Sequence, residues 1–78
     1  MSEIKTGVTE FLLKANFLPE RRKRLIQRFA IWRMRRKGLI TEQQAEQLLV
    51  MDWQDFLEWV LENAPEIIEF LMLLISLF

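Results

Sequence analysis

The chain has 78 residues and a mass of 9.5 kDa, which allows a single small domain spanning residues 1–78. It contains no histidine and no cysteine, so the sequence excludes the usual zinc and transition-metal sites, imidazole or thiol catalysis and a disulfide framework. We therefore expect neither an enzyme nor a bound cofactor. Apolar residues reach 51%, with three Trp, six Phe and four Met, so some of them should face a partner or lipid.

The zero net charge conceals two oppositely charged halves. Residues 1–40 hold all eleven basic residues and three of the acidic ones, which gives this half a net charge of +8. Residues 41–78 hold the other eight acidic residues and no basic residue, which gives −8. Such asymmetry bears on partners and solubility rather than on the fold.

The apolar periodicity predicts an all-α protein, because no run of alternating β-branched residues and no hairpin turn sequence is present. Four helices are expected, at about residues 3–16, 19–37, 42–63 and 65–77. In the second helix Leu25, Phe29 and Trp32 are expected to form the buried stripe, with Ile26 and Ala30 on its flanks. Gly38 is expected to cap that helix in the left-handed conformation.

The third helix carries the strongest local signal in the sequence. Thr41 followed by Gln44 is a capping box, and Ile40 stands where a hydrophobic staple residue is expected. Asp52 could begin a new helix, but the apolar phase continues through it, so one helix over 42–63 is favoured over two. Pro65 is expected to open the last helix.

The short connection 38–41 predicts that helices 19–37 and 42–63 are antiparallel neighbours. Residues of opposite charge then face each other at matching separations. The expected pairs are Arg33 with Glu46, Arg28 with Asp52, Arg24 with Asp55, and Arg21 with Glu58.

The basic helix 20–37 supports two interpretations. Arg24, Arg28 and Arg35 share one helix face and could contact the phosphates of a nucleic acid. Alternatively, the arginines pair with the acidic third helix and solvate the hairpin. We favour the second, because carboxylates of matching spacing lie on the same chain and the domain as a whole is neutral.

Two further clusters are interpreted as structural. The carboxylates of Asp52, Asp55, Glu58 and Glu62 could suggest acid–base catalysis or a cation site, but a solvated or arginine-paired helix face explains them better. The aromatic cluster Trp53, Phe56 and Trp59 could be a stacking platform, yet its helical spacing is more typical of a core or an interface.

The C-terminal stretch 67–78 is apolar on all sides, but its twelve residues are too few to span a membrane. Burial in an oligomer is the first interpretation, an intrachain core the second and an interfacial lipid contact the third. The predicted partner contact comprises Phe70, Leu71, Leu74, Ile75 and Phe78. The N-terminus is polar and does not have the pattern of a signal peptide, so we expect a location in the cytoplasm or within an assembly, with membrane association as an alternative.

Residues 25–49 resemble a short bacterial helical module called SHOCT. The resemblance is carried by Arg-Lys-Gly-Leu-Ile-Thr-Glu at 36–42, followed by Gln44, Leu48 and Leu49. That module has a helix, a Gly-Ile-Ile-Thr-like turn and an acidic second helix. The resemblance implies an interaction or oligomerisation element rather than a catalyst, and no functional residue is transferred from it.

Together these patterns favour a non-enzymatic structural subunit that assembles with itself or with a larger partner through apolar helix faces and opposite charge halves. A small component of a virion or phage fits this description. A nucleic-acid-binding module using helix 20–37 is the first alternative, and a membrane-surface protein anchored by 67–78 is the second.

Overall fold

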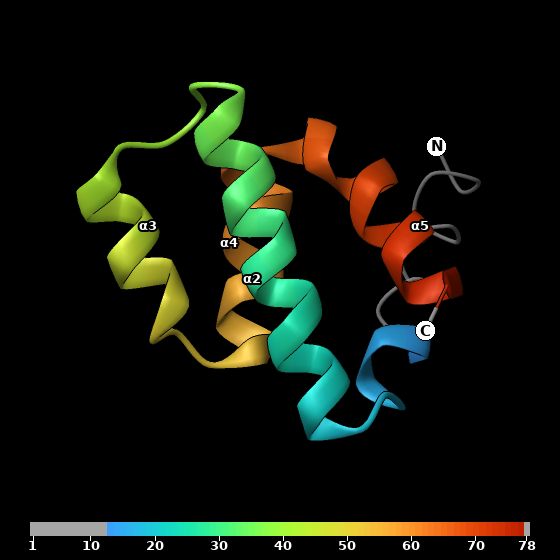
Figure 1. Cartoon of the computed structure of the whole chain (residues 1–78). Helices are drawn as coiled ribbons and strands as arrows, with labels where there is room; N and C mark the ends of the chain where they lie inside the picture. The colour runs from blue at the N-terminus through green and yellow to red at the C-terminus, as the bar shows by residue number, and fades with distance from the viewer. Residues whose placement is uncertain (1–12, 78) are drawn as a thin grey trace.

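The computed structural model describes residues 13–77, and this part of the chain is all-α (Figure 1). Its elements are α2 (Glu20–Arg36), α3 (Glu42–Leu49), α4 (Trp53–Asn63), the 3-10 turn η1 (Pro65–Ile67) and α5 (Ile68–Leu77). The class predicted from the sequence is confirmed, with no strand among the described residues. Of the predicted helix 3–16, residues 13–16 are helical and the rest lie outside the described residues.

Helix α2 is the central element of the fold. It contacts α3, α4 and α5, and Figure 1 shows α4 behind it, with α3 on one side and α5 on the other. Because three helices pack around α2, its inward face is broad. The arrangement leaves only the opposite side of α2 for solvent or a partner.

The predicted face of α2 is wrong, although its ends agree with the prediction to within one residue. The buried side chains are Ile26, Ala30, Ile31 and Met34, together with Gln27. Leu25, Phe29 and Trp32, expected in the core, are exposed. The physical reason is close packing: Ala30 at the middle of the inward face lets neighbouring backbones approach, and the larger aromatic rings lie on the outer side.

Both predicted signals at the turn after α2 are confirmed. Gly38 has φ +73°, which is the left-handed backbone conformation. Leu39 N then donates to Met34 O at 2.9 Å, and this hydrogen bond closes the C-terminal end of α2. Thr41 then begins α3 with a reciprocal capping box: Gln44 N donates to the Thr41 hydroxyl at 3.1 Å, and Thr41 N donates to the Gln44 side chain at 2.9 Å.

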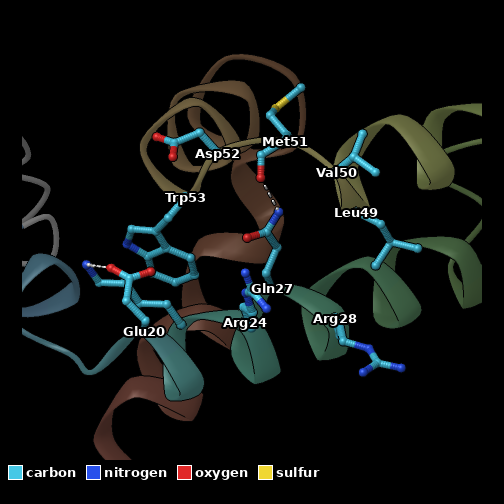
Figure 2. A pocket seen from close by; sticks show the side chains of 10 residues that line it. Glu20, Arg24, Gln27, Arg28, Leu49, Val50, Met51, Asp52 and Trp53 are labelled. Carbon is cyan, nitrogen blue, oxygen red and sulfur yellow. Dashed lines mark hydrogen bonds and ion pairs between the residues drawn. The ribbon is translucent and has the colours of Figure 1, made fainter.

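The single helix predicted over 42–63 is wrong, because the chain leaves helical geometry at residues 50–52. The buried side chain of Gln27 occupies this break. Its amide nitrogen donates to Leu48 O at 2.7 Å and to Met51 O at 3.0 Å. Figure 2 shows the bond to Met51. These carbonyls lie at the end of α3, where backbone acceptors lose their helical partners. A side chain from α2 therefore stabilises a break that the apolar periodicity does not show.

The core is completed by α4 and α5. Phe56, Leu57 and Val60 of α4 pack with Ile67 and Leu71, all at most 1% exposed. The last predicted helix begins with the 3-10 turn that starts at Pro65 and continues as α5, close to the expected range of 65–77. This path turns one side of α5 inward, so the segment contributes to the intrachain core.

Candidate protein-interaction surface

The outward side of α2 carries an apolar ridge, defined by Leu25, Phe29 and Trp32. Their side chains are 39%, 47% and 53% exposed, respectively. They follow one another at i, i+4 and i+7, so they line one side of the helix. Isolated exposed apolar residues are common on protein surfaces, but three large ones in a row on one helix make this side of α2 a candidate interaction surface.

Arginines border this ridge along its length. A hollow of about 480 Å³ is lined by the three ridge residues together with Arg28. At one end the guanidinium of Arg36 lies over the Trp32 ring, 5.1 Å from its centroid. This cation–π contact holds a positive charge beside an exposed aromatic face. The surface therefore combines apolar area with positive charge, and it suits a partner that carries both apolar groups and negative charge.

A groove beside the ridge runs between α2 and the 50–52 break (Figure 2). Its volume is about 580 Å³, and its floor includes Gln27 and Trp53. Arg24 and Arg28 line it together with Asp52, so both signs of charge are present. The exposed side chain of Val50 adds apolar area at the rim, being 86% accessible. The basic and apolar surface of α2 thus continues onto the end of α3.

The predicted hairpin pairs are not among the ion pairs that join described residues. The ion pairs observed between described residues are Lys23 with Glu20 at 3.5 Å and Arg35 with Glu42 at 2.9 Å. Arg28 and Asp52 do share the groove, as their predicted proximity requires. Asp55 does not line that groove, and Arg33 lies over the Phe70 ring of α5 instead of facing Glu46. The predicted pairs require one straight helix over 42–63 beside α2. The break after α3 interrupts that helix, so the predicted pairing of its residues with those of α2 is lost.

The three arginines predicted to contact nucleic acid differ in their surroundings. Arg24 and Arg28 are exposed and have no ion pair with a described residue. Arg35 is held by Glu42 through a hydrogen-bonded ion pair. The structure therefore brings Arg24 and Arg28 to the border of the ridge, whereas Arg35 is partly neutralised.

We expect Arg24→Ala to lower the free energy of unfolding by less than about 1 kcal/mol, because the side chain is exposed and unpaired among the described residues. Chemical denaturation at equilibrium measures this change. A loss of several kcal/mol would show that Arg24 is part of the folded framework and not of an interaction surface.

The acidic residues of α4 form a second exposed feature, the acidic ridge, defined by Asp55, Glu58 and Glu62. All three are exposed, and none forms an ion pair with a described residue. Among the described residues, no group of three acidic side chains is arranged to hold a metal ion. The acidic ridge is thus a solvated negative surface, as expected from the interpretation of these carboxylates as a solvated helix face.

The aromatic cluster of α4 belongs mainly to the core. Trp53 is 8% exposed and Phe56 is fully buried, and their rings pack 6.1 Å apart at a tilt of 33°. Trp59 is half-buried against the same core. The indole nitrogen of Trp53 is buried without a hydrogen-bond partner among the described residues. Trp53 and Phe56 are therefore core residues, and within the cluster Trp59 alone keeps substantial exposed area.

The predicted contact on the last helix is mostly turned inward. Leu71 is fully buried, Leu74 and Ile75 are half-buried against the core, and Phe70 lies beneath Arg33. Phe78 lies outside the described residues. The exposed apolar side chains of α5 are a different set, Met72, Leu73 and Leu77. The predicted partner contact on α5 stays a prediction, in which the half-buried Phe70, Leu74 and Ile75 have these exposed side chains as neighbours on the helix.

The sequence patterns do not predict the apolar ridge. The helical periodicity of Leu25, Phe29 and Trp32, which are large and apolar, predicts a buried stripe. A signal for their exposure was present, since Arg21 and Arg28 fall on the same side of the helical wheel as Leu25. A core-facing stripe bordered so closely by arginines would require charged groups at the edge of the core, which is unfavourable.

Comparison with family models, with curated proteins and with solved structures finds no match to this chain. None of the helices in the described part of the chain is both long and apolar enough to cross a membrane.

Proposed function

We propose that this chain is a non-enzymatic assembly subunit that binds copies of itself, or a larger partner, through exposed helix faces and opposite charge halves. The observation that carries the proposal is the apolar ridge of Leu25, Phe29 and Trp32 on the outer side of α2, with arginines along its borders. In the described part of the chain, the three ridge side chains stay exposed instead of entering the core.

The energetics support docking at this ridge. Full burial of a large apolar side chain contributes about 1.5–3 kcal/mol, so three partly exposed ones can offset a substantial part of the entropy lost on association. The flanking arginines add orientation and on-rate rather than much affinity. They select against basic partners and favour an acidic surface, which this chain itself carries on α4.

Two features of the hairpin region support the same proposal. The short turn after α2 and the contact between α2 and α3 favour an antiparallel hairpin. Residues 25–49 also resemble the SHOCT module, which is an interaction or oligomerisation element. The antiparallel hairpin and this resemblance are therefore both part of the proposal.

Nucleic-acid binding is the second candidate, favoured by the exposed rings of Phe29 and Trp32 beside Arg28 and Arg36. Bases stack on such rings, and arginines follow the phosphates. Assembly is preferred because Arg35 is already paired with Glu42 and because a matching acidic surface is available on every copy. Binding of a single-stranded oligonucleotide that falls steeply with salt would reverse this preference.

The proposal predicts that the solution mass exceeds one chain at low salt and falls as salt is raised, because the contact depends partly on charge. Light scattering after gel filtration measures this, with and without a mild detergent. A mass of one chain in every condition would contradict self-assembly. A protein that needs detergent to stay dispersed would instead support the lipid contact through 67–78.

A further inference from the structure

Two sets of opposite charges on this chain have the same spacing. Arg21, Arg24 and Arg28 on α2, the basic triad, are separated by three and four residues. The acidic ridge, Asp55, Glu58 and Glu62, has the same separations on α4. Building on the proposed function, we propose that the basic triad of one copy docks on the acidic ridge of the next copy, so that the protein assembles head to tail.

The two sets do not neutralise each other within one chain. All six side chains are exposed, and no ion pair joins the two sets. Helices α2 and α4 turn their buried faces toward a shared core, and Figure 1 shows α4 behind α2. The outer surfaces of the two helices therefore point away from that core, and each set is open to another molecule.

The matched spacing permits several contacts at once. At a rise of about 1.5 Å per residue, the first and last members of each set lie about 10 Å apart along their helix. Residues at i, i+3 and i+7 share one side of a helix, so two such helices lying side by side can align three pairs of opposite charge. The pairs expected inside the chain were different, with Arg28 opposite Asp52, Arg24 opposite Asp55 and Arg21 opposite Glu58. None of them is among the ion pairs between described residues, so the basic triad and the acidic ridge stay available to a second chain.

Apolar contacts can accompany this charge alignment. Leu25 lies in one hollow with the three residues of the basic triad. On α4, the half-buried side chains of Trp59 and Leu61 border the acidic ridge. The zero net charge of the chain means that copies do not repel one another as they approach.

The geometry of this contact is heterologous, since two different surfaces meet. Each added copy leaves one basic triad and one acidic ridge unoccupied at the ends of the assembly. Contacts of this kind close into rings when the rotation between copies permits and otherwise extend into filaments. This consequence separates the inference from a symmetric dimer, in which the same surface occurs on both sides.

Two neutralised variants test the inference. A basic-triad variant carries Arg21→Gln, Arg24→Gln and Arg28→Gln, and an acidic-ridge variant carries Asp55→Asn, Glu58→Gln and Glu62→Gln. Each alone is expected to self-associate at least about tenfold more weakly than the wild type at low salt. Mixed in equal amounts, they restore one intact contact, and light scattering should find a complex of twice the 9.5 kDa of one chain that grows no further.

Two controls match these variants in net charge. One carries Arg33→Gln, Arg35→Gln and Lys37→Gln, and the other carries Glu42→Gln, Glu46→Gln and Glu66→Gln. Both keep the basic triad and the acidic ridge, so both are expected to assemble like the wild type. Circular dichroism confirms that all four variants stay helical, and a variant that unfolds is replaced by its three single substitutions.

The outcomes separate the inference from the proposed function. If either triad variant keeps the wild-type mass, or if the mixture forms no pair, the head-to-tail contact is wrong while assembly through another face stands. If the control variants dissociate equally, net charge and not the matched spacing governs association, and the inference is again overturned. A wild-type protein that is monomeric at low salt would contradict both the inference and self-assembly, and of the proposed function only the binding to a larger partner would remain.

Discussion

Leu71→Ala is expected to lower the free energy of unfolding by about 2–5 kcal/mol, which is the usual cost of removing a fully buried leucine side chain. Leu71 has no exposed area and belongs to the hydrophobic core, where α5 contacts α2. Leu73→Ala, two residues along the same helix, should change this free energy by less than about 0.5 kcal/mol, because the side chain is 57% exposed.

Urea denaturation of both variants, followed by far-ultraviolet circular dichroism, measures the difference. The two variants can be compared directly because both changes remove the same atoms from positions two residues apart on α5, so the difference in helix propensity cancels. If the two variants lost equal stability, α5 would not be fixed on the core by Leu71. The solution mass of Leu73→Ala gives a second readout, since a lower mass at unchanged stability would place a partner contact on the exposed side of α5.

The ends of the helices could be predicted because they depend on local chemistry. Gly38 supplies the left-handed residue after α2, and Thr41 with Gln44 forms the cap of α3 without help from distant residues. Pro19 and Pro65 likewise mark the starts of helical segments through their fixed backbone geometry. Such signals are complete within a few residues of sequence.

The orientation of α2 could not be predicted in the same way. Apolar residues occur on both sides of this helix, so the periodicity permits either Leu25, Phe29 and Trp32 or Ile26, Ala30 and Met34 to face inward. The choice depends on three neighbouring helices that pack around α2, and their positions are set by contacts distant in sequence. The candidate surface was missed for this reason, since its residues were assigned to the core.

The basic triad and the acidic ridge show a second feature that the sequence alone cannot predict, namely whether opposite charges pair within one chain or between chains. The sequence reveals that Arg21, Arg24 and Arg28 match Asp55, Glu58 and Glu62 in spacing, but spacing alone does not say whether the match is made within one chain or between two. That decision depends on the break at 50–52, which changes the course of α4 relative to α2. The break in turn depends on Gln27, a residue that periodicity treats as an ordinary polar position.

Gln27→Met is expected to lower the free energy of unfolding by about 1–3 kcal/mol, because methionine keeps the size of the side chain but donates no hydrogen bond. The carbonyls of Leu48 and Met51 would lose the donor that they now share. Gln47→Met on the exposed side of α3 is the matched control and should change stability by less than about 0.5 kcal/mol.

Amide hydrogen exchange shows where the loss acts. With Gln27→Met, the end of α3 and the break at 50–52 should exchange faster, while the interior of α2 should keep its protection. A different result is possible because the apolar periodicity continues without interruption from Ala45 to Val60. Without the hydrogen bonds from Gln27, residues 50–52 could then become helical. Slower exchange at 50–52 in the variant would reveal that longer helix. Unchanged exchange with unchanged stability would mean that the break is stable without Gln27, and the chain between α3 and α4 would have to be held by the packing of Trp53 and Phe56 alone.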